Sequence, residues 1–570
     1  MEQKVKQVRL RAAVPGLLLA VAVPLALATS VVEAQEEASP TEAVELLDAA
    51  VEAEREISIP TRSEEEYEAA ADAYRGVLEK LDEIDYDLMD VEDQVDYDLL
   101  EARVRTQLFD IEEVELFRLH PNDYYQLGQT NRLFIRPHAI ADRGVREAVE
   151  ELEELPEILS NAKENLTRPA ETWTENAIYQ AYYAELLLTE YVPETPVDDP
   201  ELKEELLEAA EVALEAVQDY EAWLTEELLP RSDRSPAWDP DYIEYHQQVG
   251  EMIDMDLEEV LAFGEEEQER TRAEMEALAD SIHPDGSLED VWEHMKDEAP
   301  PWDGVLPMAQ SFVDMASDWL RNEGSHVVTI PDYIDYGARK SPPMSRRHLS
   351  FGGATRGPDV AGRQSGYYIL TPLEEKLSEE EKASRIRSYN PYWTNVISYH
   401  EWLGHNVQIA AAREHADPRI RRGYGSYFSQ AWSFYLEWLL EEEGFFEDRF
   451  DHHTALKHRM ARLQMRQWRV MRITTKLRMA MGDMTFDEAV QAYVDEIGME
   501  PTNAFIEVQR DSQTPRPPVR EILGEHLLFE LRDEYERRMG EHYSMRAFHD
   551  QILTYGNIPI AAIRRLMFYD

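Results

Sequence analysis

The chain has 570 residues, enough for several domains or for one large helical enzyme. Its formal net charge of −61 argues against a nucleic-acid ligand or an anionic membrane surface, because both are themselves negative. There is no cysteine, which excludes disulfides, a thiol nucleophile, Cys-bound metals and a lipid-modified cysteine.

Residues 1–34 have the pattern of a signal peptide. Four basic residues precede the apolar run AAVPGLLLAVAVPLALATSVV, and small residues end the segment at Ala34. This pattern predicts an exported protein, periplasmic or extracellular, with no membrane insertion after cleavage. An uncleaved membrane anchor is the alternative, which Pro15 and Pro24 disfavour.

After a polar linker at 35–41, apolar residues recur at spacings of three and four, which predicts amphipathic helices. We expect a helical N-terminal half at 42–260 and a catalytic-like half at 261–570. The predicted fold is mostly α, with a small β-sheet and a central cleft between the two halves.

Two segments are rich in β-branched and aromatic residues and are bounded by Gly and Pro, which is typical of strands. They are HVVTIPDYI at 326–334 and GYYILTP at 366–372. The second could hold an extended peptide by adding it to the sheet. Between the strands, the Gly-, Pro-, Ser- and Arg-rich segment 339–365 predicts a long loop over a cleft, or a surface excursion.

One predicted helix, HRMARLQMRQWRVMRITTKLRMAM at 458–481, is strongly basic in an otherwise acidic chain. We expect its arginines to pair with Glu and Asp on neighbouring helices. An electropositive wall beside a binding site is the alternative.

The segment SYHEWLGHNVQ contains His400 and Glu401, followed by His405. Two neutral imidazoles can bind zinc, and a neighbouring glutamate can take a proton from a zinc-bound water. The two histidines are five residues apart, so a regular helix would point them about 140° away from each other. A single wide turn at Gly404, with a hydrogen bond five residues along, would bring both rings to one side.

The alternative for this segment is structural. His400 and His405 would then be satisfied core histidines in a helix that packs Trp402 and Leu403 inward. Chance alone is a weak explanation, because residue frequencies give His-Glu-x-x-Gly-His roughly once in several hundred such chains.

The hexapeptide His400–His405 resembles the zinc motif of dipeptidyl peptidase III. Over a longer range, the chain resembles the bacterial family known as domain of unknown function 885, whose members look like zinc metallopeptidases of the gluzincin kind. The resemblance passes through DVEDQVDYDLLEARV, HEWLGHNVQ, QAWSFYLE and FHDQILTYGNIP. It implies a gluzincin-like helical fold.

The family pattern His-Glu-x-x-Pro-Gly-His-His-x-Gln is matched here with the Pro deleted and Asn406 at the final His. The family's Glu-Gly-Trp-Ala-Leu-Tyr-Ala-Glu, whose first Glu is the implied third zinc ligand, corresponds to 430–437. The ligand position is therefore Gln430, a neutral group that should hold zinc more weakly. Glu437 matches the second Glu, about 10 Å further along the helix.

Two other family segments are altered. The resemblance implies oxyanion donors in Val-Asp-Thr-Gly-x-His and Pro-Gly-Gln-Ala-x-x-Tyr, but the matching residues at 473–478 and 515–521 have lost the His and the Tyr. Arg478 or Arg520 could supply the positive charge instead, and loss of function explains the same changes.

These patterns predict an exported zinc-dependent peptidase, with His400, His405 and Gln430 as metal ligands and Glu401 as the general base. The expected partner is a peptide substrate or ligand. The rival prediction is a catalytically degenerate pseudoenzyme that binds peptides or proteins without cleaving them. The sequence does not predict the oligomeric state.

Overall fold

The computed structural model describes residues 39–569 except 136–141, 233–235, 332, 347–348, 357–363 and 374–375. The predicted signal peptide lies outside these residues, as does most of the predicted linker. Residues 40–570 form one compact unit. The predicted division at residue 260 falls inside a helix and stays a prediction. No helix in the described ranges is long and apolar enough to cross a membrane.

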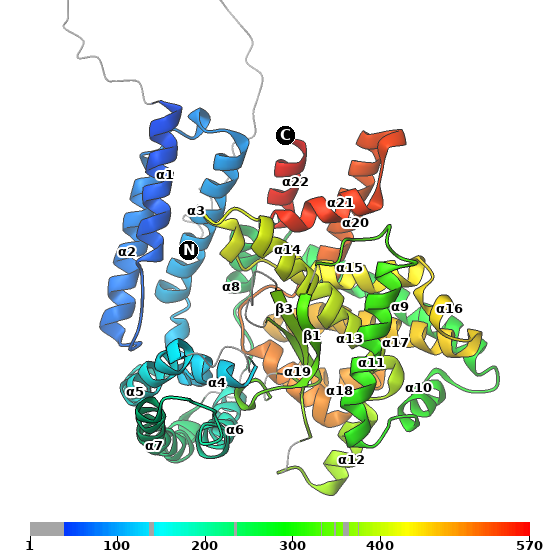
Figure 1. The fold of residues 1–570 in the computed structure, drawn as a ribbon, viewed down its shortest axis with the longest axis horizontal. Helices are drawn as coiled ribbons and strands as arrows, with labels where there is room; N and C mark the ends of the chain where they lie inside the picture. Colours follow the sequence, from blue (N-terminus) through cyan, green and yellow to red (C-terminus); the bar gives the residue numbers. More distant parts are fainter. Residues whose placement is uncertain are drawn as a thin grey trace, which may run out of the picture. The chain divides into compact units, whose positions relative to one another are not determined.

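Helices hold most of the described residues and the sheet is small, which confirms the mostly α prediction. Three helices in contact with one another come first, at the blue end of Figure 1: α1 (Pro40–Arg55), α2 (Glu64–Asp82) and α3 (Val91–Glu112). The next group is α4 (Gly128–Ile135), α5 (Asp142–Asn165), α6 (Glu171–Leu186) and α7 (Pro200–Trp223).

The helix boundaries follow capping chemistry. At the start of α2, Ser63 Oγ accepts from the Glu66 backbone N–H, and the Glu66 carboxylate accepts from the Ser63 backbone N–H. The buried side chains of α2 recur every three or four residues, so one face packs inward: Tyr67, Ala70, Ala71, Tyr74, Val77 and Leu81.

The remaining helices extend to the C-terminal end. Those before the sheet are α8 (Pro240–Tyr245), α9 (Leu257–Ile282), α10 (Leu288–Asp297) and α11 (Trp302–Arg321). Those after it are α12 (Glu379–Arg387), α13 (Pro391–Tyr399), α14 (Val407–His415), α15 (Phe428–Glu442), α16 (Phe445–Arg449), α17 (His452–Met481), α18 (Phe486–Ile497), α19 (Pro501–Ser512), α20 (Ile522–Met539), α21 (Met545–Thr554) and α22 (Ile560–Phe568).

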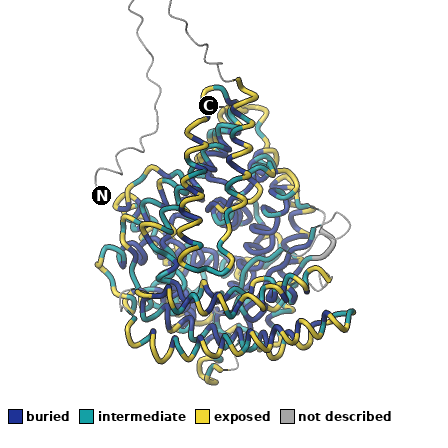
Figure 2. The backbone as a smooth tube through the Cα atoms, turned by 90° about the vertical axis from the view of Figure 1, so that its left-hand side faces the viewer, coloured by how far each residue is buried: buried dark blue, intermediate teal, exposed yellow. Residues whose placement is uncertain are grey.

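The described residues form two hydrophobic clusters. The larger joins side chains of α1–α3 to those of α9–α22, so the first three helices share a core with the second half. The smaller is built from α4–α7 and the segments between them. Figure 2 shows buried and exposed residues alternating along these helices, with the buried stretches turned inward.

The sheet has the strand order β1-β3-β2, with β1 (Tyr333–Lys340) parallel and β2 (Gly352–Arg356) antiparallel to β3 (Gln364–Leu370). The strand predicted at 366–372 is confirmed, beginning two residues earlier. Because β3 lies in the centre with both edges paired, the prediction that it adds a peptide strand is wrong.

The strand predicted at 326–334 is wrong over most of its length, since β1 begins only at Tyr333. The backbone of the earlier segment has partners in α21 instead. The Val327 carbonyl oxygen lies 2.7 Å from His549 Nδ1, and the Thr329 N–H donates to Asp550 at 2.8 Å. The loop predicted at 339–365 is wrong in part, because it contains β2.

The basic helix at 458–481 is part of α17, and most of its arginines pair as predicted. Arg466 ion-pairs with Glu267 of α9 at 2.6 Å, and Arg472 with Glu507 of α19 at 2.9 Å. Glu507 is thus a buried carboxylate that ties α17 to α19.

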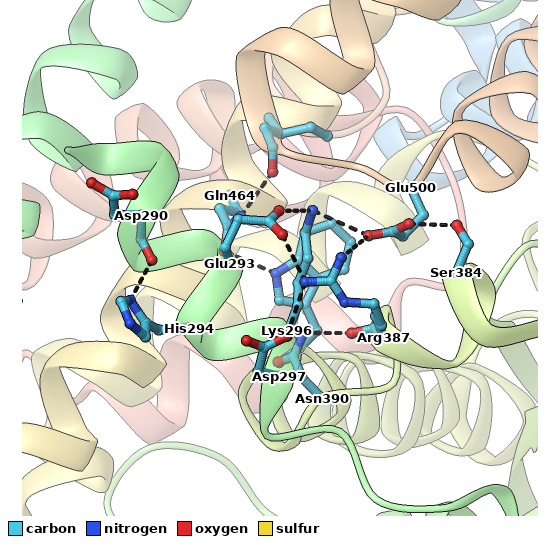
Figure 3. Close-up of polar contacts among 12 residues, drawn as sticks. Asp290, Glu293, His294, Lys296, Asp297, Ser384, Arg387, Asn390, Gln464 and Glu500 are labelled. Carbon is cyan, nitrogen blue, oxygen red and sulfur yellow. Dashed lines mark hydrogen bonds and ion pairs between the residues drawn. The ribbon is translucent and has the colours of Figure 1, made fainter. Parts of the chain in front are cut away.

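A second ionic cluster fixes the start of α19. Buried Glu500, its N-cap residue, lies 3.2 Å from Lys296 of α10 and 3.4 Å from Arg387 of α12. Arg387 also reaches Glu293 at 2.7 Å, so the cluster joins three helices (Figure 3). This ionic cluster positions α19 so that Glu507 can pair with Arg472 of α17.

Candidate functional site

Helix α13 runs directly into a π-helical segment, His400–Asn406, and then into α14. We call His400–Asn406 the π segment. The start of α13 is fixed by Asn390, whose side chain accepts from the N–H groups of Tyr392 and Trp393. The wide turn predicted around Gly404 is confirmed.

Gly404 is where the π segment meets α15. A Cβ atom at this position would lie 2.5 Å from Ser433 Oγ and 2.9 Å from Ser433 Cα, so only glycine allows the two helices this close. The close approach brings side chains of α15 against those of the motif.

The π segment turns both histidines to one side. The His400 and His405 ring centroids are 4.9 Å apart, and their planes meet at 81°. One candidate ligand atom from each of His400, Glu401 and His405 lies within 4.8 Å of the other two, and all three residues are buried. The predicted convergence of the two rings is confirmed; their role as metal ligands stays a prediction.

Helix α15 fixes the orientation of both rings. Glu437 Oε1 lies 2.6 Å from His400 Nδ1, and Ser429 Oγ lies 2.9 Å from His405 Nδ1. The two Nε2 atoms have no hydrogen-bond partner among the described residues, and His405 Nε2 lies 4.0 Å from Glu401 Oε2. Each imidazole is therefore held by one nitrogen and presents the other.

The pKa values suit neutral imidazoles beside a proton acceptor. Burial lowers the pKa of His400 and His405 well below the ordinary range, and the charge of Arg469 lowers them further. Burial also raises the pKa of Glu401 to about 7, against the opposing charge of Arg469 and a backbone hydrogen bond from Ala354 of β2. Burial likewise raises the pKa of Glu437 to about 8.

The donor set of this site fits zinc. Two neutral imidazoles and a carboxylate whose ligand atoms lie within 4.8 Å of one another are ligands that zinc accepts. Mg²⁺ and Ca²⁺ instead prefer a shell made only of oxygen ligands. A third protein ligand would have to come from outside the π segment, because Glu401 is needed as an acceptor if it acts as a base.

Gln430, the predicted third ligand, lies in the first turn of α15 and is half-buried. It stands four and seven residues before Phe434 and Glu437, so the three side chains share one stripe of the helix. Both of these residues contact His400: the Phe434 ring at 5.3 Å between centroids, and Glu437 through its hydrogen bond. Gln430 therefore lies one turn from the site, and its role as a ligand stays a prediction.

The structure distinguishes among the candidate arginines. Arg478 ion-pairs with Glu265 of α9 at 2.6 Å, and no described contact joins it or Arg520 to the motif. Arg469 of α17 is the arginine whose charge acts on His400, Glu401 and His405 alike. Sequence analysis indicated a basic helix here, but it could not single out Arg469.

Two solved structures share the fold. One is a Shewanella oneidensis protein provisionally described as a lipoprotein of unknown function, with a TM-score of 0.68, 18% identity, and coverage of 93% of this chain and 100% of that chain. The other is a Colwellia psychrerythraea protein, also provisionally described as a lipoprotein, with a TM-score of 0.73, 16% identity, and coverage of 93% and 98%.

No curated protein matches the chain. A family of bacterial proteins of unknown function, DUF885, matches residues 45–567, which is nearly the whole chain. The match spans the π segment together with α15 and α17. The chain therefore belongs to the DUF885 family.

Proposed function

We propose that the protein is a zinc-dependent peptidase of the gluzincin kind. The observation that carries the proposal is the convergence of His400, Glu401 and His405 within 4.8 Å of one another, on a π segment that a plain helix could not replace. Two neutral imidazoles with their Nδ1 atoms already bound, and a carboxylate of raised pKa beside them, are the parts that this chemistry needs.

When bound, zinc supplies Lewis acidity and lowers the pKa of its water. The chain supplies the rest. Glu401 accepts the proton of the attacking water and returns it to the leaving amine, for which a pKa of about 7 is well matched near neutral pH. Ionised Glu437 accepts from His400 Nδ1–H and Ser429 Oγ accepts from His405 Nδ1–H, which keeps each ring in the tautomer that presents Nε2.

The edge of the sheet offers a place for an extended peptide. Strand β2 lies at the edge of the sheet and contacts the π segment, so a chain paired with β2 would pass the site. A cavity of about 460 Å³ opens beside β2, lined by residues of β2, α4 and α14 including Thr355, Arg356 and Asn131. We propose β2 as the peptide-binding strand.

The two structural relatives are provisionally described as lipoproteins, which supports export of this chain as well. The 570 residues contain no cysteine to carry a lipid, so we propose a periplasmic or extracellular protein held by no lipid anchor of that type.

The second candidate is a pseudoenzyme that binds peptides without cleaving them. Gln430 favours it, because a neutral amide at the third-ligand position would weaken zinc binding. The first experiment is metal analysis of protein purified without chelator, followed by hydrolysis of a broad peptide library.

The decisive variant is Glu401→Gln. It keeps the shape of the side chain and removes its basicity, so it should retain zinc while hydrolysis falls by roughly 10²- to 10⁴-fold. Glu414→Gln, at an exposed position on α14, is the matched control and should behave as the wild type. Zinc-loaded wild type that cleaves nothing would favour the pseudoenzyme.

A further inference from the structure

Arg469 differs from the other arginines on its helix. Neighbouring buried or half-buried arginines of α17 each have carboxylate partners: Arg462 with Glu441, Arg466 with Glu267 and Glu525, and Arg472 with Glu507 and Glu521. Arg469 has no carboxylate within 4.0 Å among the described residues, although only 6% of it is exposed.

Most N–H donors of the Arg469 guanidinium have no strong hydrogen-bond acceptor among the described residues. One Nη atom lies 3.4 Å from the Met465 sulfur, a weak acceptor, and Nε has no hydrogen-bond partner among the described residues. The guanidinium packs against aromatic rings instead, since its carbon lies 3.7 Å from the Trp468 ring centroid and 4.9 Å from that of Phe434. The group therefore lies against aromatic rings and has N–H donors left for an anion.

These N–H donors are near the proposed catalytic centre. The Phe434 ring over which Arg469 lies is the same ring that contacts His400 at 5.3 Å. The positive charge of Arg469 also acts on Glu401 and Glu437, where it opposes the rise in pKa that burial causes. The side chains of α17 and α15 thus place an unpaired cation beside the convergent histidines.

A buried cation with no carboxylate in contact is unfavourable, and an anion that binds to it reduces that cost. We propose that Arg469 binds a carboxylate of the substrate, so that the protein selects peptides with a carboxylate next to the site of cleavage. The proposal rests on the proposed function for its substrate class. The carboxylate is either the free C-terminus of the peptide or an acidic side chain; both offer two oxygens to the same guanidinium fork.

The test is peptide binding by the full chain carrying Glu401→Gln, so that no probe is consumed. The probes are Ala-Ala-Ala as the free acid and as its C-terminal amide, and the amidated peptides Ala-Asp-Ala and Ala-Asn-Ala. We expect the carboxylate-bearing member of one pair to bind roughly 10- to 100-fold more tightly, as a charge-assisted hydrogen bond predicts. The favoured pair identifies the source of the carboxylate.

Arg469→Met should abolish this preference, because Met is of similar length, fits between aromatic rings and carries no charge. Arg478→Met, at a half-buried position in the last turn of the same helix, should keep it, because Arg478 pairs with Glu265. Arg469→Lys keeps the positive charge but loses the paired N–H donors of the guanidinium, so it should keep a reduced preference. This variant replaces Arg469→Met in the test if the Met variant does not fold.

The inference and the proposed function can fail separately. Equal binding of both members of each pair, or a preference unchanged in Arg469→Met and Arg469→Lys, overturns the role of Arg469 even if the wild type is an active peptidase. A preference that depends on Arg469 in a protein that holds no zinc and cleaves nothing supports the role of Arg469 and overturns the peptidase.

Discussion

Glu437 of α15 forms a hydrogen bond with His400 and so orients this proposed zinc ligand. An ionised carboxylate on Nδ1 fixes the ring's tautomer and makes Nε2 a better metal ligand, and the raised pKa of Glu437 means that zinc binding must compete with its protonation. We therefore expect Glu437→Gln to weaken zinc binding by roughly 10- to 100-fold, measured by calorimetric titration, with little change in fold.

A matched control for this variant exists at the surface. Glu443, just after α15, lies 2.6 Å from His326 Nε2 in an exposed Glu–His pair. Glu443→Gln should leave zinc affinity unchanged. If Glu437→Gln and Glu443→Gln bind zinc equally well, Glu437 does not tune His400.

The role of Gln430 as the third zinc ligand can be tested by placing a negative charge at this position. If its amide oxygen completes the zinc ligands, Gln430→Glu should raise zinc affinity by about tenfold or more, about 1.4 kcal/mol, because an anionic oxygen replaces a neutral one. Competition with a chelator of known affinity measures the change. Unaltered affinity would place Gln430 outside the ligand set.

Sequence reasoning found the residues that lie together in the chain, and it missed those brought in by packing. His400, Glu401 and His405 are recognisable because their chemistry and spacing are local. Ser429 and Arg469 carry no such signal, since each becomes important only where α15 packs against the π segment and α17 packs against α15. Which arginine of a basic helix stays unpaired depends on where every neighbouring carboxylate lies.

Among the elements, the π segment depends on the contact between Gly404 and Ser433. Gly404→Ala would force a Cβ to within 2.9 Å of backbone as well as against a hydroxyl, so α15 or the turn must move. We expect a loss of about 1–3 kcal/mol in the free energy of unfolding, as for an overpacked core, together with weaker zinc binding.

Gly76 provides the comparison for this variant. It lies inside α2, where an added Cβ would meet no atom within 4 Å, so Gly76→Ala should stabilise the helix by about 0.5–1 kcal/mol. Denaturant unfolding measures the free energy of unfolding of both variants. The difference between them separates the effect of the contact with Ser433 from the general effect of replacing a glycine in a helix. Equal changes would show that the turn tolerates a side chain.

The strands were harder to predict than the helices for a physical reason. Helical periodicity is local and repeated, whereas the segment before β1 has a strand-like composition but uses its backbone groups on α21. Strand β2 has the opposite character, with two glycines in a Gly-rich segment, and becomes a strand through pairing with β3. In both segments the neighbours in the folded chain, and not the local composition, determined whether a strand formed.

At the scale of the whole molecule, histidines buried in the core link stability to pH. His458 of α17 is 1% exposed among aromatic rings, and its Nδ1 accepts from the Asn395 amide at 3.2 Å. Burial lowers its pKa to about 3, whereas an unfolded chain would protonate it near about 6.5. Between these values the unfolded chain binds more protons, so the free energy of unfolding rises with pH.

The stabilising contribution of neutral His458 is therefore complete above about pH 6.5 and is lost as the pH falls toward about 3. His458→Phe removes this titration, so the wild type should lose about 1.4 kcal/mol per pH unit more than the variant across that window. Denaturant unfolding at pH 8 measures the packing change alone, because both rings are then neutral, and a series down to pH 4.5 measures the slope. Parallel curves for the two proteins would mean that His458 becomes protonated without unfolding, which its aromatic surroundings and its bond from Asn395 oppose.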